Sequence, residues 1–564
     1  MAGSRWPRSW DTWRLTARRR SGAWRSPATP CDASSRRVDS RGLCATIAGP
    51  GRHAPMRTVR VTGASLTAGG ADRVVVEGQF CKSSSPRTEV VITGLPDAVI
   101  RESRGRLLCA LRETRLQRGE GRFFLNLVPA ARPKSGEVLD LPLVLAGAGA
   151  VGHLDQEALG RTLFLGEVGI DGALHGVPGG LAAAMAARQA GLASLLAPPR
   201  TAREAAFVPG VEVLEATHLS QVIAHLSPEG QRLTPLDPPD LEPGETRTGH
   251  LDVVRGQAVA KHALAVSAAG GHGLLMVGPP GAGKTLLARA LLDLLPPPSI
   301  EERLELAAAL SASGRWPGGL PDRRPFRSPH HSTTHAGLVG GGNPLAAGEI
   351  TLAHHGVLFL DELPEFRREV LEALRQPLEA GEVCLSRAGR QARLPARFQL
   401  VTAMNPCPCG HHGHPRLPCH CAPQTVRRYR QRISGPLLDR IDLRLEIPPT
   451  PLEALAPSAP CDPSPKEPDA KELLGMIEGA HRLRAERNQT GTNAHLLGDA
   501  LDQFSPLQGE GRSLLAHAVE RRGLSARAVQ SLRRVARTLA DLEEQERVMP
   551  EHLAGALALR APID

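Results

Sequence analysis

The stretch Leu274-Leu-Met-Val-Gly-Pro-Pro-Gly-Ala-Gly-Lys-Thr-Leu-Leu287 decides how the central part of this chain folds. It begins as a short apolar strand, continues as a glycine-rich turn, and leads into a helical pattern from Leu286 to Leu295. Glycines let backbone N–H groups approach a phosphate closely, and the N-terminal end of a helix stabilises negative charge. A chance glycine-rich turn would not require the flanking strand and helix. We therefore predict a phosphate-binding loop that comprises Gly278, Pro279, Pro280, Gly281, Ala282, Gly283, Lys284 and Thr285.

Two further features assign chemistry to this loop. Lys284 is placed to reach the β- and γ-phosphates of a nucleotide, and the hydroxyl of Thr285 is a ligand for Mg²⁺. The run Val357-Leu-Phe-Leu-Asp-Glu362 reads as a buried strand that ends in two carboxylates. Asp361 would bind the metal ion, and Glu362 would polarise the water that attacks the γ-phosphate. The predicted cofactors are therefore ATP and Mg²⁺.

Two later polar residues complete the predicted catalytic set. Asn405 follows an apolar strand over Phe398–Ala403, so it would lie between the two earlier motifs and orient the attacking water. The alternative is a turn asparagine before Pro406. Arg440, in Gly435-Pro-Leu-Leu-Asp-Arg-Ile-Asp442, can stabilise transition-state charge on the nucleotide of a neighbouring subunit. The competing interpretation of this arginine is an ordinary surface salt bridge.

The remainder of the sequence divides into blocks by composition. Residues 57–228 read as an α/β domain, and residues 229–248 form a linker rich in Pro, Asp, Glu and Thr. Residues 249–450 alternate strands with helices, as expected for a parallel sheet. A second Pro-rich linker covers residues 451–470, and residues 471–564 show helical spacing throughout. The predicted fold class is α/β with a helical C-terminal domain.

The charge of the chain is concentrated at its beginning. The 564 residues carry a net charge of +10, but residues 1–55 alone hold eleven Arg, no Lys and three Asp. The rest of the chain is therefore nearly neutral, so the overall charge gives no argument for a nucleic-acid partner. Three interpretations of residues 1–56 compete: a disordered basic arm, a transit-like leader, or sequence upstream of a true start at Met56. No apolar run approaches the roughly 20 residues of a membrane-spanning helix, so no membrane partner is expected.

The number and spacing of the cysteines indicate the cellular compartment and a candidate metal site. Ten Cys in a chain of this length, without a secretory signal, favour a reducing cytoplasm over a disulfide framework. Four of them form the pairs Cys407-Pro-Cys409 and Cys419-His-Cys421, and four thiolates so placed can hold a tetrahedral Zn²⁺. Four Cys ligands leave no open position, so such a zinc ion would be structural. The Cys-x-Cys spacing is tighter than the usual Cys-x₂-Cys, and reduced cysteines in a polar loop are the alternative.

A basic hairpin is predicted over Glu382–Leu394, with its turn at Ala388-Gly389. It carries three arginines that suit the phosphates of a DNA backbone, namely Arg387, Arg390 and Arg393. The alternative is a solvated basic turn. A second candidate loop for substrate contacts carries His330, His331, Ser332 and His335.

Several longer stretches of the sequence, some of which contain these motifs, are distinctive. They include Thr93-Gly-Leu-Pro-Asp-Ala98, Phe326-Arg-Ser-Pro-His-His331, Gly348-Glu-Ile-Thr-Leu-Ala-His-His-Gly-Val-Leu-Phe-Leu-Asp-Glu-Leu-Pro-Glu365, Ala403-Met-Asn-Pro-Cys-Pro-Cys-Gly410 and Leu524-Ser-Ala-Arg-Ala528. In these phrases the chain resembles the magnesium chelatase-like AAA+ ATPases of bacteria, the YifB/ComM family. The resemblance runs from about Arg57 to the C-terminus and leaves out the basic leader.

The resemblance implies an architecture and an assembly. It implies an N-terminal domain similar to the Lon protease domain (the ribosomal S5 domain 2-like fold), a central AAA+ P-loop domain and a C-terminal helical lid. It also implies a homo-hexameric ring. Arg527 opens a helix after Ser525, and the resemblance implies that it reaches back to the γ-phosphate. In related ring motors a hairpin in the position of Glu382–Leu394 projects into the central pore.

The resemblance also implies a function. The expected activity is ATP hydrolysis that drives translocation on single-stranded or branched DNA, as in a branch-migration helicase of natural transformation or recombination. A metal-chelatase motor acting on a tetrapyrrole complex and a protein-remodelling chaperone are the alternatives. Chelatase ATPase subunits generally lack the Lon-like domain, which favours the DNA motor.

The Lon-like domain raises the question of proteolysis. A protease site of that type needs a Ser nucleophile that is activated by a Lys of lowered pKa. Val138 occupies the position of the Ser, and Ala182 occupies the position of the Lys. Because both halves of the dyad are missing, we predict that the domain has no protease activity.

Overall fold

The computed structural model describes most of the chain after the basic leader. The described residues are 57–82, 88–113, 121–130, 134, 136–152, 154–241, 248–342, 346–387, 390–449 and 468–562. The predictions for residues 1–56, for most of the second linker and for the turn of the basic hairpin lie outside these ranges.

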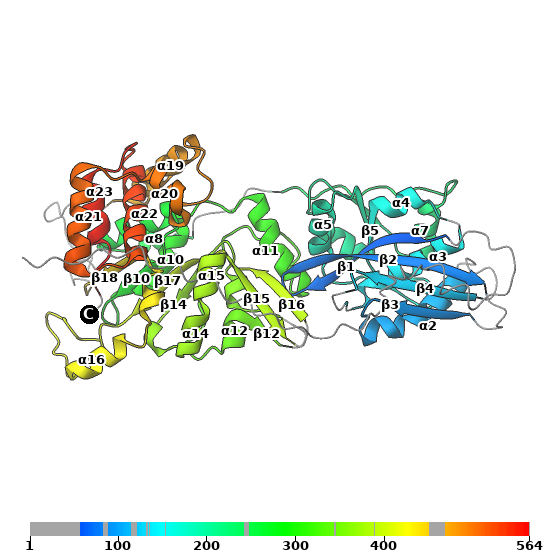
Figure 1. Cartoon of the computed structure of the whole chain (residues 1–564), viewed down its shortest axis with the longest axis horizontal. Helices are drawn as coiled ribbons and strands as arrows, with labels where there is room; N and C mark the ends of the chain where they lie inside the picture. The colour runs from blue at the N-terminus through cyan, green and yellow to red at the C-terminus, as the bar shows by residue number, and fades with distance from the viewer. Residues whose placement is uncertain are drawn as a thin grey trace, which may run out of the picture. The chain divides into compact units, whose positions relative to one another are not determined.

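A seven-stranded mixed sheet organises the N-terminal part (Figure 1). Its order is β3-β4-β2-β1-β5-β8-β9, with β1, β2 and β4 paired antiparallel and β1, β5, β8 and β9 paired parallel. Val59 and Val61 are buried while Arg60 between them is exposed, because successive side chains of a strand point to opposite faces. The strands are β1 (Val59–Thr67), β2 (Gly70–Lys82), β3 (Glu89–Thr93), β4 (Gly121–Val128), β5 (Thr162–Phe164), β8 (Ser194–Ala197) and β9 (Glu212–Glu215).

Helices pack on this sheet and complete its core. They are α2 (Ala98–Glu113), α3 (Asp140–Val151), α4 (Gln156–Arg161), α5 (Gly180–Gln189), α6 (Pro199–Ala205) and α7 (Leu219–Leu226). Val138 and Ala182 are each only 3% exposed and belong to the apolar core. These two positions therefore offer neither a nucleophile nor a base, in keeping with the sequence. The α/β character is as predicted, whereas the likeness to the Lon domain stays a prediction.

A second, fully parallel sheet of five strands forms the central part, in the order β11-β14-β17-β10-β18. Two of its inner strands, Leu274–Val277 and Val357–Leu360, are continuous apolar runs, as expected where helices cover both faces of a parallel sheet. The carboxyl ends of neighbouring parallel strands meet at one edge, so the segments that follow β10, β14 and β17 lie together. The strands are β10 (Leu274–Val277), β11 (Phe326–Arg327), β14 (Val357–Leu360), β17 (Gln399–Met404) and β18 (Leu443–Glu446).

Helices and two short hairpins surround the central sheet (Figure 1). The helix expected over Leu286–Leu295 begins at Lys284 as α10 (Lys284–Ala290) and continues as a 3₁₀ turn over Leu291–Leu294. The predicted basic hairpin is confirmed as the antiparallel pair β15 (Glu382–Arg387) and β16 (Arg390–Pro395). Further elements are α8 (His250–Val253), α9 (Ala258–Gly270), α11 (Ile300–Ala312), α12 (His335–Val339), β12 (Gly340–Gly341), β13 (Ala346–Ala347), α13 (Glu349–Leu352), α14 (Arg368–Ala373), α15 (Arg375–Ala380), α16 (Pro423–Arg430) and α17 (Gly435–Leu438).

Helix α11 ties the central part to the N-terminal part. Leu304, Ala307 and Ala308 on this helix belong to the same apolar cluster as the N-terminal sheet. At its start, Glu301 forms an ion pair with Arg188 of α5 at 2.7 Å. Residues 249–450 were predicted as one domain from their composition, but this helix within them shares its core with the preceding domain.

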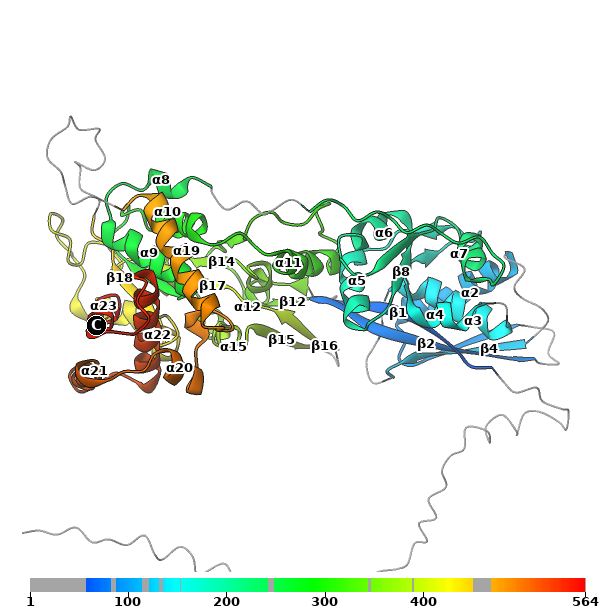
Figure 2. The ribbon, with the colours of Figure 1, turned by 90° about the horizontal axis from the view of Figure 1, so that it is seen from above.

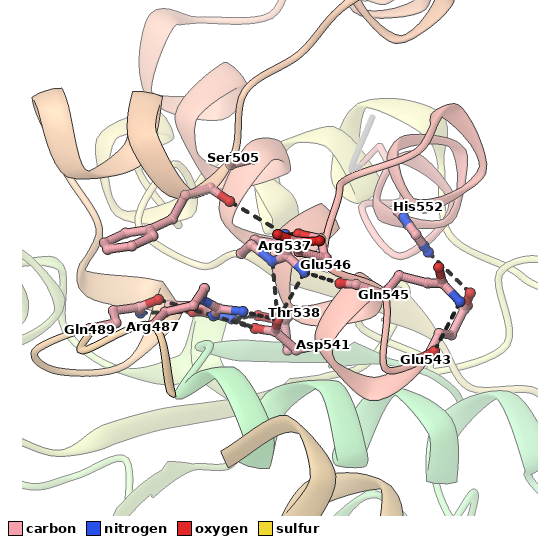
Figure 3. A network of polar contacts seen from close by, with 12 residues as sticks. Arg487, Gln489, Ser505, Arg537, Thr538, Asp541, Glu543, Gln545, Glu546 and His552 are labelled. Carbon is pink, nitrogen blue, oxygen red and sulfur yellow. Dashed lines mark hydrogen bonds and ion pairs between the residues drawn. The ribbon is translucent and has the colours of Figure 1, made fainter. Parts of the chain in front are cut away.

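The C-terminal part consists of helices, as predicted: α19 (Ala470–Glu486), α20 (Gly498–Phe504), α21 (Gly509–Arg522), α22 (Ala526–Leu542) and α23 (Pro550–Ala558). A buried polar network holds them together (Figure 3). Asp541 accepts hydrogen bonds from Arg537 of the same helix and from Arg487 after α19. Arg537 is 1% exposed, and its other N–H groups donate to the carbonyls of Gln545 and Glu546. Buried charges of this kind are tolerated because each has its partners.

The C-terminal helices also connect to the central sheet. Figure 2 shows α19 and α22 beside α9, and the three helices share an apolar cluster. Within that contact the buried imidazole of His272 bonds Thr538 of α22 through Nε2 and Asp442 through Nδ1, each at 2.8 Å. Among the described residues, no helix is both long and apolar enough to cross a membrane.

Candidate nucleotide site

The phosphate loop leaves the end of β10 and enters α10. Gly281 and Gly283 have φ angles of +77° and +82°, a region that residues with a side chain rarely adopt. Gly278 lies so close to β18 that a Cβ atom there would come within 2.5 Å of the carbonyl oxygen of Ile447. The glycines predicted from the motif are therefore required by the backbone path.

The ammonium group of Lys284 connects the phosphate loop to Asn405. Its ammonium group donates to the carbonyl oxygens of Gly278 at 2.6 Å and Pro279 at 2.9 Å, and to Oδ1 of Asn405 at 3.1 Å. Burial lowers the pKa of Lys284, and the nearby carboxylates of Asp361 and Glu362 oppose that shift. Phosphate oxygens would offer this ammonium better acceptors than neutral carbonyls, because hydrogen bonds between charged groups are stronger.

Thr285 and Asp361 meet next to the loop. The hydroxyl of Thr285 donates to Oδ2 of Asp361 at 3.1 Å, which joins the start of α10 to the end of β14. Hydroxyl and carboxylate oxygens are ligands that Mg²⁺ accepts, so this pair fits the ion that accompanies a nucleotide.

Glu362 follows Asp361 in a strained backbone conformation. Its φ angle of +52° lies in the left-handed region, which is uncommon for residues other than glycine and occurs at functional sites. Its side chain is 53% exposed, and Oε2 lies 3.3 Å from Nδ1 of His331. The carboxylate predicted to polarise water is therefore open to solvent and is contacted by one histidine.

The two predicted arginines contact the same carboxylate. Arg440 and Arg527 each place an Nη2 atom 2.5 Å from Oε1 of Glu379, on α15. The structure therefore pairs Arg527 with Arg440 and, in the described contacts, not with the loop of its own chain. The salt bridge considered as an alternative for Arg440 is present, but its partner carboxylate is shared with Arg527.

The four clustered cysteines border the same site. The Sγ–Sγ distances are 3.3 Å for Cys407–Cys409, 3.7 Å for Cys407–Cys419 and 3.6 Å for Cys409–Cys419. The Sγ atom of Cys421 completes a group in which all ligand atoms lie within 4.8 Å of one another. Such a group can hold a metal ion.

The cysteine loop packs directly on the phosphate loop. Gly410 has a φ of +82°, and a Cβ atom at this position would lie 2.5 Å from Cδ of Pro280. The loop begins two residues after Asn405, which accepts from Lys284. The cysteine cluster therefore borders two parts of the nucleotide site.

The structure describes only part of the predicted DNA-contacting set. Arg393 is exposed on β16 and forms a long ion pair of 3.7 Å with Glu382 across the hairpin. The side chains of Arg387 and Arg390 lie outside the described residues, although their backbones pair with each other.

Sequence reasoning missed two contacts of the site. His331 was noted only as part of a candidate substrate loop, and nothing in the motif linked it to Glu362. Glu379 lies in the short helix α15 and belongs to no recognisable motif. Both contacts join segments that are distant in the sequence, so only the folded chain reveals them.

The sequence of this chain is similar to those of several known proteins and protein families. Residues 250–455 match the family described as magnesium chelatase, subunit ChlI, residues 468–560 match the ChlI C-terminal family, and residues 81–201 match the family described as subunit ChlI of Mg-chelatase. The protein YifB of Salmonella typhimurium is 40% identical over 480 residues, which cover 84% of this chain and 91% of YifB. The competence protein ComM of Haemophilus influenzae is 37% identical over 494 residues, 85% of this chain and 93% of ComM.

A DNA replication protein matches a shorter part of the chain. DNA replication licensing factor MCM3 homolog 1 of Zea mays is 28% identical over 133 residues, which cover 24% of this chain and 15% of that protein.

The site predicts different defects for Lys284 and Glu362. Lys284→Ala should weaken ATP binding by roughly a hundredfold or more, because a charge-assisted contact to the phosphates is lost. Glu362→Gln should bind ATP normally but lower kcat by roughly 10² to 10⁴, the usual contribution of a general base. Fluorescent-nucleotide titration and phosphate release separate the two effects. Hydrolysis at the normal rate by Glu362→Gln would show that this carboxylate does not activate the water.

Proposed function

The chain belongs to the YifB/ComM-type family of magnesium chelatase-like proteins, and from this we propose that it is an ATP-hydrolysing ring motor that acts on DNA. One observation carries the ATPase part of the proposal. Lys284, Thr285 and Asp361 come from two different strand ends and meet at one edge of the central sheet, where Asn405 joins them. This is the arrangement that phosphoryl transfer requires.

Each of these residues has a distinct part in hydrolysis. Lys284 and the backbone N–H groups of the loop bind the β- and γ-phosphates, and Thr285 and Asp361 hold Mg²⁺, which neutralises charge on the phosphate oxygens. Glu362 accepts a proton from water as the water oxygen bonds to the γ-phosphorus. The bond to the β-phosphate oxygen breaks, and ADP and inorganic phosphate leave. Asn405 orients the water against the γ-phosphate.

The arginine pair supports a site shared between subunits. Arg440 and Arg527 meet at Glu379 rather than at the loop of their own chain. A nucleotide bound to a neighbouring subunit would be a stronger acceptor for both guanidinium groups than one carboxylate. We therefore propose a homo-hexamer in which both arginines act on the nucleotide of the neighbour.

Mixing two inactive variants tests the shared site. An Arg440→Ala subunit keeps an intact Glu362, and a Glu362→Gln subunit keeps an intact Arg440. A mixed ring should therefore recover a fraction of the wild-type turnover at interfaces that contain both intact residues. ATP turnover is measured across mixing ratios after subunit exchange. Full activity of Arg440→Ala alone would contradict a role of this residue in trans.

DNA is the proposed substrate for two reasons. One of the similar proteins is named a competence protein, and another is named a DNA replication licensing factor. The β15–β16 hairpin carries three arginines, of which Arg393 is exposed. A chelatase motor for a tetrapyrrole complex or a protein-remodelling chaperone would take first place if DNA has no effect.

The hairpin arginines should couple the motor to DNA. Replacing Arg387, Arg390 and Arg393 with Ala should make the log–log salt dependence of single-strand binding shallower by about 2, since each lost phosphate contact contributes about 0.7. DNA-stimulated ATP hydrolysis should disappear, while basal hydrolysis remains. The control variant replaces three exposed arginines of the C-terminal part with Ala, namely Arg512, Arg521 and Arg547, and so makes the same change in charge. No DNA binding by the wild type at any salt concentration would contradict the DNA motor.

We further propose that the cysteine cluster binds a structural Zn²⁺. Zinc–sulfur bonds of about 2.3 Å in a tetrahedron place the sulfurs about 3.8 Å apart. The three Sγ–Sγ distances among Cys407, Cys409 and Cys419, 3.3 to 3.7 Å, come close to that edge and are far longer than a disulfide bond. In addition, the backbone N–H of His412 donates to Sγ of Cys407, a contact that stabilises a thiolate.

Metal analysis tests the zinc proposal. The purified protein should contain about one Zn²⁺ per chain, and Cys419→Ser with Cys421→Ser should lose it, because two thiolates hold zinc far more weakly than four. The control variant changes Cys109 and Cys384, two exposed cysteines outside the cluster. A wild-type protein without zinc after purification free of chelators would favour reduced cysteines in a polar loop.

A further inference from the structure

The phosphate loop contains two glycines that receive no packing from other described segments. Gly281 and Gly283 have positive φ angles, and a Cβ atom at either position would meet no described atom within 4 Å beyond its chain neighbours. Glycine gives the unfolded backbone more freedom than any other residue, so holding two such positions in one shape costs conformational entropy. A contact that reaches the loop from another segment would offset part of that cost.

The cysteine loop, residues 407–421, supplies such a contact. A Cβ atom at Gly410 would lie 2.5 Å from Cδ and 2.8 Å from Cγ of Pro280, so the buried backbone of Gly410 lies directly against the proline ring. Neither Pro279 nor Pro280 has an N–H group, so the backbone donors that can bind phosphate begin at Gly281. The position of the Pro280 ring therefore determines where the series of donors starts.

The position of Gly410 depends in turn on the cysteines. Gly410 directly follows Cys409, and its N–H donates to the carbonyl oxygen of Cys407 at 3.0 Å. The buried Sγ atom of Cys407 lies 3.3 Å from Sγ of Cys409 and 3.7 Å from Sγ of Cys419. A metal ion bound by these sulfurs would fix the turn from Cys407 to Gly410. Free thiol groups form only weak hydrogen bonds, so the turn would be held less firmly without the ion.

The same loop is joined to a second part of the nucleotide site. Asn405 lies two residues before Cys407, and its Oδ1 atom accepts a hydrogen bond from the ammonium group of Lys284 at 3.1 Å. The cysteine cluster therefore approaches the phosphate loop along two paths. One path ends at the ring of Pro280, and the other ends at Lys284.

We propose that Zn²⁺ bound by the four cysteines regulates ATP binding, because it holds the phosphate loop in its binding conformation through the positioning residue Gly410. The proposal rests on the ATP site and on the zinc ion proposed above. Two ligands that stabilise the same conformation must each raise the affinity of the protein for the other by the same factor. ATP should therefore bind more tightly when zinc is present, and zinc should be held more tightly when ATP is present.

Alanine at position 410 tests the contact in the full-length protein. Gly410→Ala keeps all four cysteines and should retain zinc, but its Cβ atom must displace the ring of Pro280. The Kd for ATP should rise roughly tenfold, within the usual range of coupling between two sites. The kcat at saturating ATP should stay near the wild-type value, because Asp361 and Glu362 are untouched. Fluorescent-nucleotide titration, phosphate release and metal analysis give the three values.

Gly413→Ala is the matched control. Gly413 lies in the same loop with a φ of +78°, close to the +82° of Gly410, so alanine introduces similar backbone strain at both positions. A Cβ atom at Gly413 would meet no described atom within 4 Å, so the Kd for ATP should remain that of the wild type. In addition, Pro280→Ala removes the ring atoms that Gly410→Ala would contact. The losses of affinity in these two variants should therefore not add in the double variant.

The reciprocal measurement follows the metal. Release of zinc to a chromophoric chelator is recorded with and without saturating ATP and Mg²⁺, in Glu362→Gln protein so that ATP is not hydrolysed. ATP should slow the release roughly tenfold, because the same coupling holds in both directions and affinity changes fall mainly on dissociation. Lys284→Ala protein, which should bind ATP poorly, should show no change. That comparison also separates the effect of bound ATP from zinc binding by free ATP.

The outcomes separate the coupling from the assignments on which it depends. A wild-type Kd for ATP in Gly410→Ala, or zinc release that ATP does not change, would overturn the proposal. Equal losses of ATP affinity in Gly410→Ala and Gly413→Ala would also overturn it, because loop strain would then be the cause. A wild type that binds ATP but contains no zinc would contradict the metal assignment and remove zinc as the regulator. A wild type that binds no ATP would contradict the proposed function itself. Matching circular dichroism melts confirm that the variants compared are folded.

Discussion

The buried ammonium group of Lys284 is the constraint on which the nucleotide site depends. Its three acceptors come from the phosphate loop and from Asn405 at the end of a neighbouring strand. A charge that is removed from water must be compensated, so these segments are held at fixed distances from one another. The parallel sheet provides that geometry because the ends of β10, β14 and β17 lie side by side. The cysteine loop packs against Pro280 and adds support from outside the sheet.

Much of this site can be predicted from the sequence, and the reason is physical. A short apolar strand, a turn that needs positive φ angles and a helix that begins at Lys284 are all determined by neighbouring residues. Asp361 and Asn405 also follow, because a residue after a buried parallel strand must emerge at the ligand-binding edge. The C-terminal helices and the basic hairpin were predicted for similar local reasons. In each case, the pattern and its consequence lie within about 20 residues of one another.

The contacts that were not predicted join segments with no local pattern in common. His331 meets Glu362, Glu379 bridges two arginines from separate segments, and α11 shares its core with the N-terminal sheet. From composition we placed α11 in the central domain, because the charge and hydrophobicity of a helix do not show which domain packs against it. The resemblance implies that Arg527 reaches back to the γ-phosphate, and its contact with Glu379 depends on how α22 is oriented.

The orientation of α22 is fixed by a second series of buried hydrogen bonds, near the C-terminal end of this helix. Thr538 bonds His272, and His272 bonds Asp442, two residues after Arg440. Arg560 strengthens the same connection by donating to the carbonyls of Ile441 and Asp442. Helix α22 therefore carries Arg527 at its start and, through Thr538 and His272, is tied to the segment of Arg440. Because none of these buried groups can lose its partner without cost, a displacement of α22 would move both arginines together. The polar core thus helps to place both arginines, and the carboxylate of Glu379, which accepts from both guanidinium groups, offsets the repulsion between their like charges.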